Sequence, residues 1–110
     1  MNELTITDNQ IIQDKIYTIR NVQVMLDEDL AVMYGVETKQ LNKSVNRNID
    51  RFPEKFRFQL TKEEYENLRF HFGTSSLDKE HGGRRYLPYV FTEQGVSMLS
   101  AVLRSQTAIG

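Results

Sequence analysis

Apolar and polar positions follow two different periods along the chain, and the strand-like period comes first. Residues 16–19 and 22–26 are apolar, β-branched runs that residues 20–21 separate, a pattern that predicts a β-hairpin. In residues 56–60 apolar and polar side chains alternate, which predicts a strand with one apolar and one polar face.

The polar face of that strand would carry Arg57 and Gln59. A last strand is predicted over residues 86–91, at an edge of the sheet or bulged, because Pro88 has no amide hydrogen for a central ladder. We expect the aromatic side chains of these strands to share one apolar cluster: Phe56, Phe58, Tyr86 and Phe91.

Two helices joined by a tight turn are predicted between the hairpin and the next strand. Asp27 is expected to cap the first helix, and the small side chain of Ala31 allows a second helix to cross closely. Gly35 can adopt the positive φ of a sharp turn. Thr38 is expected to cap the second helix, which would end near Arg51, before Phe52-Pro53.

Two later helices have their own start signals. Thr61 and Glu64 form the spacing of a capping box, and Tyr65 and Leu68 follow as inward residues. Thr92 is expected to cap the last helix. Its apolar stripe consists of Val96, Leu99, Val102 and Leu103.

The order of these elements predicts a single α+β domain over residues 15–110, preceded by a flexible arm of residues 1–14. A helix-turn-helix-like helix pair would combine with a small antiparallel sheet and two further helices in a winged-helix-like arrangement. Residues 71–83 have the composition of a loop. The candidate wing is the tip with Gly82, Gly83, Arg84 and Arg85.

The second helix of the pair has two chemically different faces. At about 100° per residue, Leu41, Val45, Asn48 and Ile49 would face the core, with Asn48 as a buried amide bonded to a neighbouring loop. The opposite face would carry three cations and two carboxamides: Lys39, Gln40, Lys43, Asn46 and Arg47. Cations neutralise phosphates, and carboxamides can pair with adenine, although an ordinary solvated helix has a similar composition.

The charge distribution is uneven although the chain carries 14 basic and 15 acidic residues. Residues 1–30 contain two basic and six acidic residues, a net charge of −4, whereas residues 39–57 contain six basic and two acidic residues, a net charge of +4. The positive segment is centred on the second helix, as a phosphate-binding surface requires. The alternative is that the two segments pair with one another inside the fold.

Other chemistry has little support in the sequence. There is no cysteine, which excludes disulfides and thiolate zinc sites, and no apolar run long enough to cross a membrane. His71 and His81 lack the spacing of a zinc pair, and no phosphate-binding glycine motif or nucleophile with a supporting base is present. We therefore expect a cytoplasmic protein without enzymatic activity, cofactor, metal or membrane partner.

Two long motifs carry a family resemblance: LDEDLAVMYGVETKQLNKSVNRNIDRFPEKFRFQL, and GGRRYLPYVFTEQGVSMLSAVLRS from residues 82–105. Together they resemble the ORF-six-N domain, a DNA-binding module related to the KilA-N and Bro-N domains of phages, prophages and large DNA viruses. The resemblance implies similarity to the amino-terminal part of a phage-type regulatory or antirepressor protein. In such proteins a carboxy-terminal region usually follows.

The sequence thus predicts sequence-specific binding of double-stranded DNA. Gln40 and Asn46 are the predicted base readers, and Arg51, Arg84 and Arg85 the predicted phosphate contacts. The full predicted surface comprises Thr38, Lys39, Gln40, Lys43, Asn46, Arg47, Arg51, Arg84 and Arg85. The alternative is a protein-interaction module that captures a repressor or host factor without touching DNA, and a homodimer through the last helix is a further option.

Overall fold

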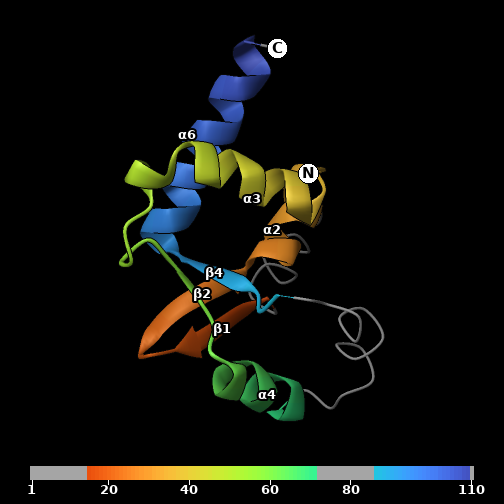
Figure 1. The fold of residues 1–110 in the computed structure, drawn as a ribbon, viewed down its shortest axis with the longest axis vertical. Coiled ribbons are helices and arrows are strands. Elements are labelled where there is room, and N and C mark those ends of the chain that lie inside the picture. Colours follow the sequence, from red (N-terminus) through yellow and green to blue (C-terminus); the bar gives the residue numbers. More distant parts are fainter. Residues whose placement is uncertain (1–14, 72–85, 110) are drawn as a thin grey trace, which may run out of the picture.

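A computed structural model describes residues 15–71 and 86–109, so the predicted arm and the predicted wing lie outside the described residues (Figure 1). The order of elements is the predicted one. They are β1 (Ile16–Ile19), β2 (Val22–Leu26), α2 (Asp27–Tyr34), α3 (Thr38–Arg47), the 3₁₀ helix η1 (Ile49–Arg51), β3 (Arg57–Gln59), α4 (Lys62–His71), β4 (Tyr89–Thr92) and α6 (Glu93–Ile109).

The predicted hairpin is confirmed residue by residue. β1 and β2 pair antiparallel with Ile19 opposite Val22, so Arg20 and Asn21 alone form the turn. Both turn residues have positive φ, 55° and 64°. Two residues with positive φ are what a type I′ turn requires, and this turn matches the twist of the strands that it joins.

The last strand is central rather than at an edge, which corrects the prediction from Pro88. The four strands lie in the order β1-β2-β4-β3, and every neighbouring pair is antiparallel. Pro88 stands just before β4, where its carbonyl accepts a 3.0 Å hydrogen bond from the amide of Leu60. Its missing amide hydrogen therefore falls outside the β4 ladder.

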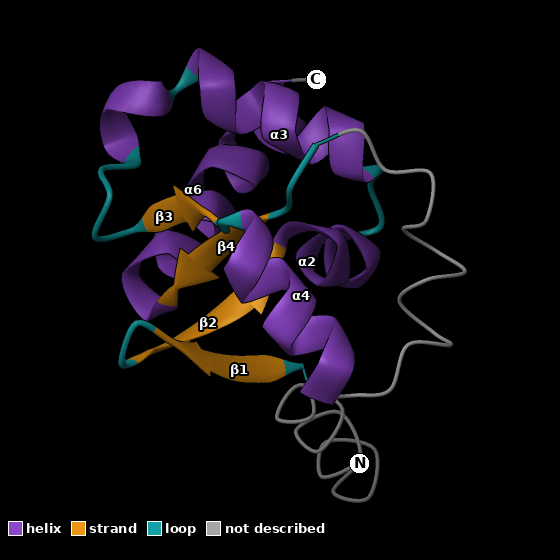
Figure 2. Ribbon diagram, turned by 60° about the horizontal axis from the view of Figure 1, so that its bottom comes forward, coloured by secondary structure: helices purple, strands orange, loops and turns teal. Residues whose placement is uncertain are grey.

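Helices cover both faces of the sheet, as Figures 1 and 2 show. Met25 and Phe91 point to the face that α2, α3 and α6 cover, whereas Val90 and Phe58 point to the other face, where Leu68 of α4 packs. The expected single aromatic cluster is therefore wrong. Phe91 and Phe58 lie in different cores, and Tyr86 is 71% exposed.

Arg57 is buried, contrary to the expectation that it lies on an exposed polar face. It pairs with Phe91 in the sheet register, so its side chain emerges on the face that three helices cover. The guanidinium lies 3.7 Å from the centre of the Tyr89 ring. Burial lowers the pKa of Arg57, and the nearby Tyr89 and Asp27 oppose that shift.

The later helix starts follow the sequence signals. The amide of Thr61 donates to Glu64 Oε1 at 2.8 Å, and the amide of Glu64 donates to Thr61 Oγ1 at 3.1 Å, which confirms the capping box. Thr92 Oγ1 accepts from the amide of Gly95, which confirms the cap of α6. Thr38 does not cap α3, because it is the first helical residue and Glu37 precedes it without a side-chain cap.

Gly95 packs directly against the turn before β3. A Cβ at this position would overlap the carbonyl of Phe56, which is backbone and cannot rotate away. Although alanine is the better helix former, we predict that Gly95→Ala lowers the free energy of unfolding by about 3 kcal/mol. Urea unfolding measures this loss. Ser97→Ala, at an exposed site on the same helix, should change stability by no more than about 0.5 kcal/mol.

Hydrogen bonds from Arg20 connect the hairpin turn to α4. Its Nε and Nη2 donate to Glu64 at 2.8 and 3.1 Å, and these bonds are the main reason why the pKa of Glu64 lies below its ordinary value of 4.5. A pKa that is lower in the folded than in the unfolded state stabilises the protein at pH values above the unfolded-state pKa. This contribution to the free energy of unfolding is lost as the pH falls. We predict that Glu64→Gln lowers the free energy of unfolding at about pH 6. The difference in this free energy between the variant and the wild type should shrink below about pH 4, as urea unfolding at several pH values would show.

Candidate nucleic-acid interface

The turn between α2 and α3 has the geometry that its glycine predicts. Gly35 ends α2 with a φ of 70°, and its amide donates to Val32 at 3.1 Å. The amide of Val36 reaches back to the carbonyl of Ala31 at 3.0 Å, which completes a Schellman motif. Ala31 is 2% exposed, so the small residue lies in the core beneath the helix pair as expected.

The predicted inward face of α3 is confirmed at Leu41 and Val45, whereas the prediction is wrong at Asn48 and Ile49. Leu41 and Val45 are fully buried in the core that includes Leu99 of α6. Ile49 is 48% exposed, because α3 ends at Arg47 and the 3₁₀ geometry of η1 changes the direction of the side chains that follow.

Asn48 belongs to the end of α3 rather than to a contact with a loop. Its side-chain amide is only half-buried and donates to the carbonyl of Ser44, four residues back in the same helix, at 2.9 Å. The backbone amide of Asn48 also donates within the helix, to Val45 at 2.9 Å. Asn48 is thus a structural residue as expected, but its partner is its own helix.

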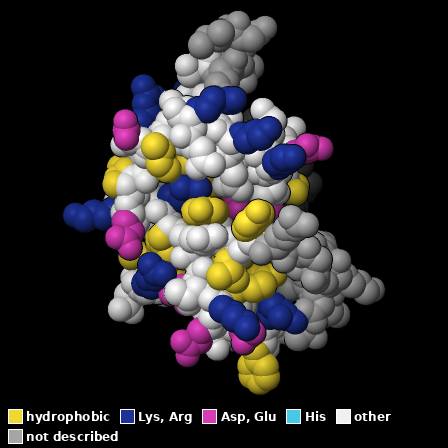
Figure 3. Space-filling view, viewed as in Figure 1, with side chains coloured by type: hydrophobic (Ala, Val, Ile, Leu, Met, Phe, Trp, Pro, Cys, Tyr) yellow, Lys and Arg dark blue, Asp and Glu magenta, His cyan; other side chains and the backbone are white. Residues whose placement is uncertain are grey.

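The outward face of α3 carries the predicted residues. All five predicted groove-facing side chains between positions 39 and 47 are exposed, Thr38 is half-buried, and Arg51 is exposed in η1. Figure 3 shows dark blue Lys and Arg side chains over the region of α3. Arg84 and Arg85 lie outside the described residues.

The cations of this face have no acidic partner in the described part of the chain. The ion pairs there join Lys15 to Asp29, and Arg20 to Glu54 and Glu64. None involves α3 or η1. Arg47 is bonded only weakly, with Nη2 3.5 Å from the hydroxyl oxygen of Ser44. Among the described cations of the positive segment, the alternative that the two segments pair inside the fold therefore holds only for Arg57, which Asp27 attracts, and no described ion pair neutralises the cations of α3 and η1.

A buried carboxylate ties α3 to the rest of the fold, and sequence reasoning missed it. Asp27 is fully buried, and its Oδ2 accepts from Asn42 Nδ2 at 3.0 Å and from the amide of Tyr89 at 3.3 Å. Its Oδ1 accepts from the amide of Glu28 at 2.7 Å. The expected capping role is wrong, because Asp27 is already the first residue of α2 and Leu26 holds the cap position.

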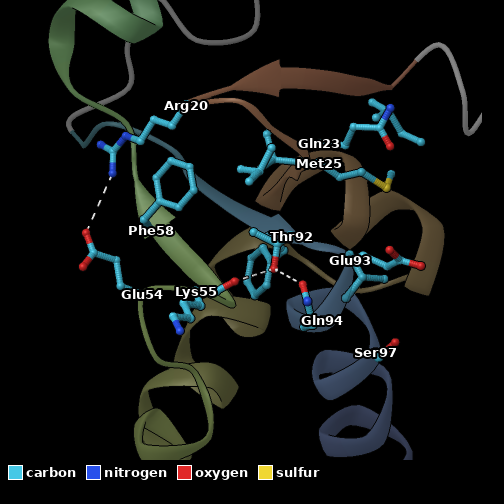
Figure 4. Close-up of a pocket in the computed structure, with 15 residues that line it drawn as sticks. Arg20, Gln23, Met25, Glu54, Lys55, Phe58, Thr92, Glu93, Gln94 and Ser97 are labelled. Carbon is cyan, nitrogen blue, oxygen red and sulfur yellow. Dashed lines mark hydrogen bonds and ion pairs between the residues drawn. The ribbon is translucent and has the colours of Figure 1, made fainter.

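An open cleft lies elsewhere, between the hairpin, the turn before β3 and the first residues of α6 (Figure 4). Its walls include Phe58, Phe91 and Val24, and the pair of Arg20 and Glu54 lies at its side. No residue of α3 lines it. The exposed cations of α3 and η1, Lys39, Lys43, Arg47 and Arg51, form a basic face. The cleft and this basic face are built from different elements. Among the described residues, no three His, Asp or Glu side chains gather as a metal site would require.

A comparison with protein families decides the kind of domain. The model of the ORF6N domain matches residues 14–102, which include the helix pair, the sheet and most of α6. The chain belongs to the ORF6N domain family. ORF6N is a regulatory type of domain from phage-type, antirepressor-like proteins and is not an enzyme family. No curated protein and no solved structure matches this ORF6N chain. None of its described helices is both long and apolar enough to cross a membrane.

We predict that Asn42→Ala loosens α3, because it removes the side-chain bond between this helix and Asp27. A hydrogen bond to a charged group contributes about 1.5–3 kcal/mol, so the free energy of unfolding should fall by that amount. Chemical denaturation provides the measurement. The matched control is Asn46→Ala, which changes an exposed asparagine on the same helix. Equal losses of unfolding free energy in the two variants would contradict a stabilising role for the bond between Asn42 and Asp27.

Proposed function

We propose that this ORF6N domain binds double-stranded DNA through the exposed face of α3. One observation carries the proposal: α3 is fixed by buried residues on one side and presents three cations and two carboxamides on the other, with no acidic partner among the described residues. The major groove of B-DNA is wide enough to admit such a helix.

The surface around α3 supplies the backbone contacts in this proposal. Lys39 lies in the first turn of α3 and Arg51 in η1 after its end, so the two cations flank the helix along its length. Both are exposed and suited to phosphate oxygens on the two sides of the contact. The sequence-based roles of Thr38 at the helix start, and of Arg84 and Arg85 as a wing, stay predictions.

The second candidate function is capture of a repressor or another regulatory protein. The observation that favours it is the apolar outer side of α2, where Val32 is 80% and Met33 is 47% exposed. An apolar patch on one helix and a basic face on the next can serve two different partners. A pull-down that recovers a protein in the absence of DNA would support this function, and a second copy of the chain is one partner that sedimentation would detect.

Titration of a duplex pool at several salt concentrations tests the DNA proposal. The logarithm of the binding constant should fall linearly with the logarithm of salt, because each phosphate contact displaces counterions. Lys39→Ala and Arg51→Ala should each make the slope shallower by about 0.9 and weaken binding to all sequences alike.

The matched control is Lys62→Ala, which removes an exposed cation from α4 on the opposite side of the sheet. Its salt slope should equal that of the wild type. Absence of binding at low salt, or a flat slope for the wild type, would refute the proposal. A Lys62→Ala effect as large as that of Lys39→Ala would move the contact surface away from α3.

A further inference from the structure

We infer that Lys43 reads guanine on the floor of the major groove, and that the carboxamides predicted as base readers contact the groove walls. The inference rests on the proposed DNA binding by α3 and adds to it the base that is recognised. Its basis is the position of Lys43 relative to the two fully buried apolar residues of the helix, Leu41 and Val45.

Helical geometry places Lys43 directly opposite the core. At about 100° per residue, Leu41 and Val45 lie about 160° from Lys43, one on each side. Both have 0% exposure and mark the apolar side of the helix, and the third buried residue, Ser44, lies about 100° from Lys43. In a helix that lies in a groove with the protein body outside, the side chain opposite the core points to the groove floor.

The carboxamides lie at the edges of the exposed face. Gln40 and Asn46 are about 60° from Lys43 in opposite directions, and both are exposed. Side chains at these angles meet the walls of the groove, where phosphate and sugar oxygens accept hydrogen bonds from amide groups. Arg47 lies about 40° from Lys43, on the same side as Gln40, and its Nη2 is 3.5 Å from the hydroxyl oxygen of Ser44.

The backbone at Lys43 is fixed by both of its neighbours. Asn42 is bonded to the buried Asp27, and Ser44 is 1% exposed. The direction of the Cα–Cβ bond of Lys43 is therefore set before any ligand binds, which favours specific recognition. Guanine presents two acceptors in the major groove, O6 and N7, and an ammonium group can donate to both. The preferred site should therefore contain a guanine at its centre.

In-vitro selection from random duplexes tests the inference with the wild type and Lys43→Ala. The wild-type consensus should contain a fixed guanine, and Lys43→Ala should lose that preference and bind the wild-type site roughly 5- to 150-fold more weakly. Lys43→Arg should keep the guanine, because arginine reads the same acceptors, whereas Lys43→Gln should move the preference toward adenine. Thermal unfolding of each variant checks the fold, and this exposed position should leave it unchanged.

Gln40→Ala and Asn46→Ala provide the matched comparison, since they should weaken binding without changing the consensus. The inference is overturned if the consensus has no fixed guanine, if Lys43→Ala weakens binding equally on all sequences, or if Asn46→Ala is the variant that changes the consensus. These outcomes all leave DNA binding intact. Failure of the wild type to bind any duplex refutes the proposed function instead, so the two failures are distinguishable.

Discussion

The position of the basic face depends on the hydrogen bonds that the buried carboxylate of Asp27 accepts. A charge without water is stable only when its lone pairs are satisfied, and here the donors come from α2, α3 and β4. Arg57 is buried on the same side of the sheet. Burial lowers the pKa of Arg57, and the attraction between its positive charge and Asp27 partly opposes this shift. The first residue of α2 therefore fixes where α3 lies relative to the sheet.

Local signals predicted the elements well because each depends on neighbours in the sequence. The hairpin turn, the Schellman glycine and the capping box each involve residues within five positions of one another. The failures have a different cause. Arg57 and Pro88 were placed wrongly because their surroundings depend on which strand lies beside β4, and nothing near them in the sequence specifies that neighbour.

The candidate site was predictable to a similar extent. Between positions 39 and 47 the helical wheel placed its seven assigned residues on the correct sides, since a regular helix repeats its own geometry, but it did not assign the buried Ser44. It failed at Ile49, where η1 breaks the repeat. The bond between Asp27 and Asn42 spans 15 residues and a turn, and an aspartate before a helix is normally interpreted as a cap. Only the folded arrangement shows that this carboxylate points inward.

The distribution of charge partners explains how a chain with a net charge of −1 can present a basic face. Acidic side chains are used inside the fold: Asp27 holds α3, and Glu64 holds both its own helix start and the hairpin turn. The cations of α3 and η1 have no such role among the described contacts. In the proposed complex, the described basic face offers only a few cations to the phosphates, which would make the salt-dependent attraction to any DNA sequence modest. A single base contact would then contribute a larger share of the total binding free energy, so the proposed surface suits discrimination between sequences better than general affinity for DNA.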